Sequence, residues 1–207
     1  MNAVHLEVFY QMHTFLADIV GVSDTAAFVA SLPYTLKSIL ARTHDQDTWI
    51  PSRDFSMWLA ALDLQALPQL DKFFLRFGRV FVENHATCFG ASSSHFMVFL
   101  FHRNPHVAIL SLAKQLQSNF ETLKTWFLPL NLAVDEKISL QMLRFHLAAR
   151  PSPLPVFCEL IMGITTGLLE LYHVPYLRIF EENCHIEGHG ICTFLIELES
   201  ANPLSFM

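Results

Sequence analysis

The sequence predicts a mixed α/β (α+β) domain, in which helices come first and a helix followed by a β-hairpin comes last. Apolar residues recur every three or four positions through most of the first 120 residues, as expected for amphipathic helices. After residue 122 the texture changes to short segments separated by turn residues. The closing segment places Cys192, Phe194, Ile196 and Leu198 on one face, as a half-buried strand does.

The individual elements follow from these patterns. The first helix is predicted over 6–20, where Gly21 ends it. Further helices are expected at 26–32, 33–42, 58–64, 67–84, 105–120 and 156–173, with a polar loop at 43–54. Strands are expected at 122–132, 137–147, 175–182 and 191–199, and the last two form a hairpin through the EGHG turn at 187–190. The aromatic run HFMVFLFH, residues 95–102, fits either a strand or a buried helix.

Composition excludes several classes of protein. The chain of 207 residues is 52% hydrophobic and 15% charged, which excludes intrinsic disorder. A net charge of −6 argues against direct contact with nucleic acid, which requires a basic face. The mean hydropathy is +0.35, but the longest apolar stretch, 154–172, is interrupted by Glu159 and Glu170. The start of the chain has no basic region typical of a signal peptide. We therefore expect a cytoplasmic domain with no membrane span.

The surplus of apolar residues, including 19 Phe, has two interpretations. One is a solid core with an additional oligomer face, and the other is a cavity for a small hydrophobic ligand. Trp126 and Phe127 are the candidates for the cavity wall, although core packing is the simpler explanation for either residue alone. His102 and His106, which flank the end of the aromatic run, are the candidates for polar contacts to such a ligand.

Three of the four cysteines fall in the last 50 residues, around the predicted helix and hairpin. Cys158 lies near the start of the helix, whereas Cys184 and Cys192 flank the hairpin turn. Glu181 precedes Cys184 by three residues. Three thiolates and a carboxylate would give Zn²⁺ four ligands in a closed structural site. Buried free cysteines are the alternative, and His185 or His189 could replace one ligand.

The hairpin also resembles a known family. The segments FEENC (180–184), EGHG (187–190) and CTF (192–194), together with the helix at 158–167, resemble the C-terminal signature of the 4-vinyl reductase (V4R) domain. This domain is the ligand-sensing module of bacterial transcriptional activators of the phenol and xylene type. The resemblance implies a structural zinc site formed by Cys158, Glu181, Cys184 and Cys192. It also implies a fold shared with haem nitric-oxide sensors and vesicle-tethering subunits, with a hydrophobic cavity between helices and an antiparallel sheet.

The resemblance divides the chain into an N-terminal helical segment, 1–45, suited to dimerisation, and a V4R-like ligand-binding domain, 46–207. No catalytic motif is present, so we predict a sensory domain rather than an enzyme. It would act as a homodimer and signal to a protein partner or output module. No Tyr-x-Ser-x-Arg motif for haem propionates is found, so we expect no haem. An accessory factor in tetrapyrrole metabolism and a lipid-filled structural protein of the vesicle-tethering type are the alternative functions.

Overall fold

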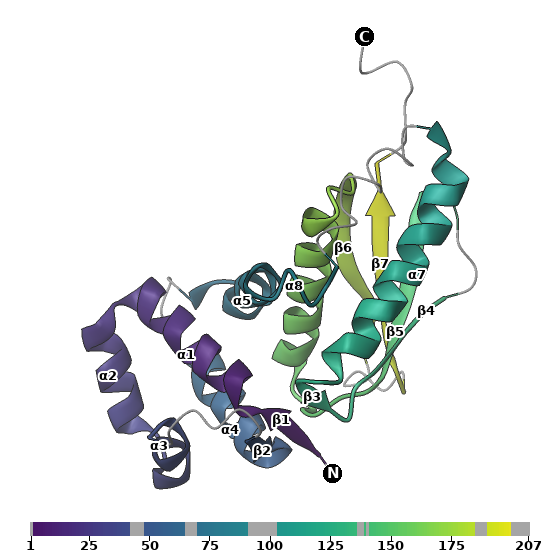
Figure 1. Cartoon of the computed structure of the whole chain (residues 1–207). Helices are drawn as coiled ribbons and strands as arrows, with labels where there is room; N and C mark the ends of the chain where they lie inside the picture. The colour runs from purple at the N-terminus through teal and green to yellow at the C-terminus, as the bar shows by residue number, and fades with distance from the viewer. Residues whose placement is uncertain are drawn as a thin grey trace.

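The computed structural model of the chain describes residues 2–41, 48–64, 70–90, 103–135, 139, 141–184 and 190–199 (Figure 1). The helices are α1 (Leu6–Val20), α2 (Val22–Ser31), α3 (Tyr34–Leu40), α4 (Ser52–Asp63), α5 (Phe73–Asn84), α7 (Pro105–Leu123) and α8 (Pro155–Leu171). The strands are β1 (Ala3–His5), β2 (Trp49–Pro51), β3 (Phe127–Leu128), β4 (Asn131–Val134), β5 (Met142–Ala149), β6 (Tyr176–Asn183) and β7 (Cys192–Leu198). The predicted mixed α+β fold class is confirmed.

The N-terminal helices form one group in space, and the sheet of β4 to β7 with α7 and α8 forms another (Figure 1). Helix α1 begins after His5, whose Nδ1 accepts a hydrogen bond from the Glu7 amide at 3.3 Å, and it ends at Gly21 with φ of 91°. A small antiparallel sheet in the order β2-β1-β3 joins the two groups. The first 45 residues therefore share a sheet with both 49–51 and 127–128.

The larger sheet has the order β4-β5-β7-β6 and is antiparallel throughout. Its inner face is built from alternate residues of β5 and β7, because Phe145 pairs with Phe194 in register. The rings of these two residues stack at 4.8 Å, and Phe120 of α7 packs on Phe145 at 5.2 Å. This apolar layer fixes helix α7 against the centre of the sheet.

Helix α5 lies between the two groups and crosses α8 at very short range (Figure 1). A Cβ added at Gly163 of α8 would lie 2.2 Å from the backbone oxygen of Leu75, and one added at Gly78 of α5 would lie 2.6 Å from the backbone nitrogen of Ile164. The two helix backbones can approach this closely only because both positions lack a side chain. The crossing ties the N-terminal helices to α8, the helix that carries Cys158 in its first turn.

Several element boundaries differ from the sequence prediction. The first helix, 6–20, is confirmed, and the last hairpin agrees to within one residue at each end. The predicted strand 122–132 is wrong at its start, because α7 continues to Leu123 and the chain then turns before the two-residue strand β3. Part of the predicted polar loop, 49–54, forms β2 and the first turn of α4. The aromatic run 95–102 lies outside the described residues.

No helix in the described part of the chain is both long and apolar enough to cross a membrane. The most apolar candidate from the sequence, the stretch 154–172, instead forms the buried helix α8. It packs against α5 on one side and the sheet on the other.

Candidate functional site

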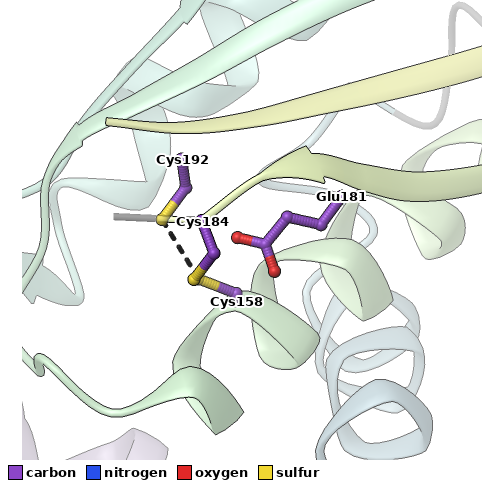
Figure 2. A group of neighbouring side chains, drawn as sticks. All are labelled: Cys158, Glu181, Cys184 and Cys192. Atoms are coloured by element: carbon purple, nitrogen blue, oxygen red, sulfur yellow. Dashed lines mark hydrogen bonds between the residues drawn. The ribbon is translucent and has the colours of Figure 1, made fainter. Parts of the chain in front are cut away.

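The four side chains predicted to hold a metal ion lie together at one end of the large sheet (Figure 2). One potential ligand atom from each of Cys158, Glu181, Cys184 and Cys192 lies within 4.8 Å of all the others. The sulfur atoms of Cys158 and Cys192 are 3.5 Å apart. For comparison, two thiolates bound to one tetrahedral ion at about 2.3 Å are separated by roughly 3.8 Å. The four donors could therefore share one ion.

The fold explains why these residues meet. Cys158 is in the first turn of α8, which begins at Pro155, a residue favoured there because its missing N–H needs no partner. Cys192 opens strand β7, while Glu181 lies on β6 opposite Phe194, on the inner face of the sheet. Cys184 follows directly after β6. One helix terminus and two neighbouring strands thus bring the donors to the same corner.

Strand alternation separates the two adjacent glutamates as the sequence predicts. Glu181 points toward the three sulfur atoms (Figure 2), whereas Glu182 lies 3.5 Å from the Arg144 guanidinium on the outer face. The Oε1 atom of Glu181 is buried and accepts no hydrogen bond from any residue that the structure describes. A buried carboxylate oxygen without a partner costs about 1–3 kcal/mol, and a cation at this point would remove that cost.

The electrostatics of the cluster depend on burial and on one guanidinium. Burial raises the pKa of the Cys158 thiol, and the neighbouring Cys192 and Glu181 raise it further. Arg150 opposes this trend, because its Nη1 donates to the Cys158 sulfur at 2.9 Å and to the Cys192 sulfur at 3.3 Å. Sequence reasoning missed Arg150, since a single arginine before the PSPLP loop carries no recognisable signal.

The predicted ligand-binding residues divide into two groups. Trp126 and Phe127 are buried in an aromatic cluster, in which Trp126 contacts Phe81 at 5.3 Å and Phe127 contacts Phe157 at 5.7 Å. His106, in contrast, is exposed in the first turn of α7 and does not join this cluster. His102, like His185 and His189, lies outside the described residues.

Two buried polar networks surround the aromatic cluster and were not predicted. The Tyr172 hydroxyl accepts hydrogen bonds from Asn119 at 2.6 Å and Gln115 at 3.1 Å, and donates to the Phe89 carbonyl. On the other side, the ring of His85 has Nδ1 2.8 Å from the Phe81 carbonyl and Nε2 3.1 Å from the Glu7 carboxylate. Their residues are far apart in sequence, so no local pattern could have revealed them.

Comparisons with known proteins identify the fold. No protein-family model matches the chain, and no curated protein is similar to it in sequence. Several solved structures of H-NOX proteins resemble it in fold. One from K. algicida, in the unliganded Fe(II) state, has a TM-score of 0.64 and 13% identity over 98% of this chain and 100% of that one. One from S. oneidensis, in the Fe(II)NO state, has a TM-score of 0.58 and 14% identity over 94% and 99%.

These structures correct the family assignment. The expectation of a V4R domain is wrong, because the similar structures are H-NOX proteins and none supports V4R identity. The signature that suggested V4R covers only about 155–198, one helix and one hairpin, whereas the similarity extends over nearly the whole chain. A local motif of this length can be carried by related folds, so the long-range packing of the first 150 residues decides between them.

The cofactor expectation also needs correction. We expected zinc and no haem, yet the similar structures contain haem iron. A further H-NOX structure, from work on haem distortion, has a TM-score of 0.52 to this chain. The absence of a Tyr-x-Ser-x-Arg motif was therefore an insufficient reason to exclude haem from this fold. Zinc receives no support from these proteins. The metal cluster must be judged on its own geometry.

Three of the described histidines can be examined as candidate axial ligands for haem iron. His85 is the buried histidine among them, and the Phe81 carbonyl and the Glu7 carboxylate already occupy both of its ring nitrogens. His106 is exposed, and His146 lies on the outer face of the sheet, where its Nδ1 is 3.1 Å from the Thr193 hydroxyl. None of these three histidines therefore offers a buried ring nitrogen that lacks a partner among the described residues.

Proposed function

We propose that this chain is a sensory domain that binds a small molecule between its helical group and its sheet, and that signals the binding to a partner. The H-NOX architecture, which covers 94–98% of the chain, is the observation that carries this proposal. The similar structures include unliganded and NO-bound forms. We extend the binding of a small ligand by this fold to the present chain. The sequence similarity is low, so the ligand of this chain has to be argued from its own residues.

The aromatic cluster around Trp126 and Phe127 is the proposed ligand region. Phe127 contacts Phe55 of α4 at 6.4 Å and Phe157 of α8 at 5.7 Å, so it touches both halves of the molecule. The Trp126 ring contacts the ring of Phe81 in α5, with 5.3 Å between their centroids. A small hydrophobic molecule that inserted here would have to displace these rings, and would thereby shift α5 relative to the sheet. That shift is the proposed signal.

The cluster of Cys158, Glu181, Cys184 and Cys192 is proposed to bind one divalent metal ion that prefers thiolate ligands. Four protein ligands would complete a tetrahedral site, so the ion would have no open position for substrate or water. Its role would be structural. It would fasten the first turn of α8 to the hairpin and so hold the sheet side of the ligand region in place while α5 moves.

The N-terminal segment, 1–45, is proposed to mediate a homodimer through which occupancy reaches the partner. Val22 of α2 is 78% exposed and Tyr34 of α3 is 83% exposed, so both offer apolar surface to a second copy of the chain. Analytical ultracentrifugation of the whole chain tests this point. A dimer that V22E and Y34E convert to monomer is expected, and a monomer at all concentrations would contradict it.

Ligand binding is tested by titrating the purified chain with haemin and with a panel of small apolar molecules, following tryptophan fluorescence and melting temperature. We expect one class of ligand to quench the fluorescence and raise the melting temperature. The quenching should weaken in W126F and persist in W49F, because Trp49 lies on β2 next to His5, away from the cluster. A Soret band would identify haem as the ligand. No response to either class would overturn the proposal.

A further inference from the structure

Arg150 forms hydrogen bonds both to the sulfur cluster and to the loop that precedes α8. It follows strand β5 directly, and its guanidinium uses both terminal nitrogens. Nη1 donates to the sulfurs of Cys158 and Cys192, while Nη2 donates to the Pro153 carbonyl at 3.3 Å. The last bond fixes the guanidinium in place, because Pro153 lies just before the helix that carries Cys158.

The three sulfurs of the cluster are therefore not equivalent. Cys158 and Cys192 are buried and accept hydrogen bonds from Arg150. Cys184 is half-buried, and no hydrogen bond from a described residue reaches its sulfur. A donor to a thiolate withdraws charge from sulfur and lowers its nucleophilicity, as charge-assisted hydrogen bonds generally stabilise the anion that accepts them. Because Arg150 does not donate to it, the Cys184 sulfur is the most electron-rich of the three. Because Cys184 is only half-buried, its sulfur is also the most accessible.

Charge balance gives Arg150 a second effect. Three thiolates and one carboxylate around a divalent ion carry a net charge of −2, which is costly in a partly buried site. The Arg150 guanidinium reduces this to −1 and does so through hydrogen bonds to two of the ligands themselves. Outer residues of this kind orient and charge-compensate the ligands of protein metal sites.

We propose that Arg150 is the positioning residue of this metal site, and that by binding Cys158 and Cys192 it leaves Cys184 as the reactive sulfur. The inference rests on the proposed metal ion at the four-residue cluster. With iodoacetamide as a probe, the Cys184 thiolate supplies the electron pair for the new S–C bond, and iodide leaves with the electron pair of the C–I bond. The other two sulfurs react later.

The test compares Co²⁺ binding by the wild-type chain, R150M, R150K and the control R178M. Arg178 is 67% exposed and pairs with Glu197 on the outer face of the same sheet, so its loss should not affect the cluster. We expect R150M to bind Co²⁺ about 10–100-fold more weakly, and R150K to recover part of the loss because it keeps the charge without the planar pair of donors. The sulfur-to-cobalt charge-transfer band should shift in R150M and not in R178M.

The order of alkylation gives an independent readout. In the Co²⁺-loaded wild-type chain, mass spectrometry should find iodoacetamide on Cys184 before Cys158 and Cys192, and in R150M the latter two should react faster than in the wild-type chain because they have lost their donor. Wild-type affinity and wild-type alkylation rates of Cys158 and Cys192 in R150M would overturn the role of Arg150 while leaving the metal site intact. Failure of the wild-type chain itself to bind Co²⁺ would overturn the metal site, and this inference with it.

Discussion

The middle and the first turn of helix α8 contact their neighbours in opposite ways. In the middle of the helix, Gly163 and Gly167 bring the α8 backbone against α5 so closely that a Cβ at Gly163 would meet the Leu75 backbone. In the first turn, Cys158 faces two more sulfurs and a carboxylate oxygen that has no hydrogen-bond partner among the described residues. The first contact rests on close backbone packing and needs no added ion, whereas we expect the second to reach its full stability only when a cation joins it.

The largest expected effect comes from filling the α5–α8 crossing. G163A would place a methyl group 2.2 Å from the Leu75 carbonyl oxygen, and because the obstacle is backbone, the helices must separate. We expect a loss of about 3 kcal/mol in the free energy of unfolding, at the upper end for overpacked cores, measured by denaturant titration.

G167A provides the matched control for this variant. Its new Cβ would lie 3.0 Å from Val82 Cβ and 3.1 Å from Arg79 Cα, contacts that small shifts can relieve. The gain in helix propensity, about 0.5–1 kcal/mol, should offset much of the strain in G167A and little of it in G163A. Equal stability of G163A and wild type would show that the backbones of α5 and α8 lie farther apart at Gly163 than the structure places them.

Metal removal should affect the first turn of α8, where Cys158 lies. If the ion is present at about 100 times its dissociation constant, stripping it with a chelator should lower the free energy of unfolding by about 2.7 kcal/mol. For a chain of this size that corresponds to a fall of roughly 5–10 °C in melting temperature, measured by calorimetry. C192A should show the lower melting temperature without chelator.

C88A is the control for this experiment, because Cys88 is exposed and does not belong to the cluster. It should respond to the chelator as the wild-type chain does. A melting temperature that the chelator leaves unchanged in the wild-type chain would mean that the first turn of α8 needs no ion.

Y172F tests the junction of α7 and α8, which is held by polar contacts rather than by close approach. Burial raises the pKa of the fully buried Tyr172, so its hydroxyl is protonated at neutral pH and can donate to the Phe89 carbonyl. Without it, Asn119 and that carbonyl lose a partner inside the core, at a cost of about 2 kcal/mol. Denaturant titration measures the loss, and Y176F, whose hydroxyl binds the exposed Glu170, should lose far less.

The smallest effect concerns Glu7 at the N-terminal side. Burial opposes ionisation of Glu7, but the hydrogen bond and charge of His85 and a hydrogen bond from Trp126 outweigh it, so its pKa is lowered below 4.5. Ionised Glu7 therefore stabilises the fold above pH 4.5, and this contribution is lost as the pH falls through the lowered value.

Because the Glu7 side chain is 42% exposed, the contribution is on the order of 0.5 kcal/mol. Stability of E7Q should accordingly fall less between pH 6 and pH 3 than stability of the wild-type chain does. E121Q, which removes an exposed carboxylate paired with Lys124, is the control, and it should follow the wild-type curve. An identical pH dependence of E7Q and wild type would refute the coupling between Glu7 and His85.

The contrast within α8 also explains what could be predicted from the sequence. Glu181, Cys184 and Cys192 could be placed near one another because strand alternation and the hairpin turn are local signals. Cys158 could be added because its helix could fold back over the sheet and because of the resemblance to the V4R helix. The approach of Gly163 to Leu75 could not, since it joins two helices about 90 residues apart and leaves no periodic trace. The same holds for the three-residue strands β1 and β2, whose pairing is decided by tertiary contacts.

Family assignment failed for a related reason. The hairpin signature was read correctly as a pattern of cysteines and glutamate, but it describes one corner of the molecule. The end of α7 at Leu123 and the turn to Phe127, where the prediction placed a continuous strand, are set by contacts with α5 and the small sheet. These long-range contacts belong to the fold that this chain shares with the H-NOX structures, and a single sequence does not display them.

X-ray absorption at the cobalt edge of the Co²⁺-loaded chain tests the central claim most directly, because it reports the atoms bound to the ion. The account predicts one ion per chain with three sulfur neighbours and one oxygen neighbour, and loss of one sulfur in C184A. A first shell made only of nitrogen and oxygen atoms, or a spectrum that C158A and C192A leave unchanged, would contradict it.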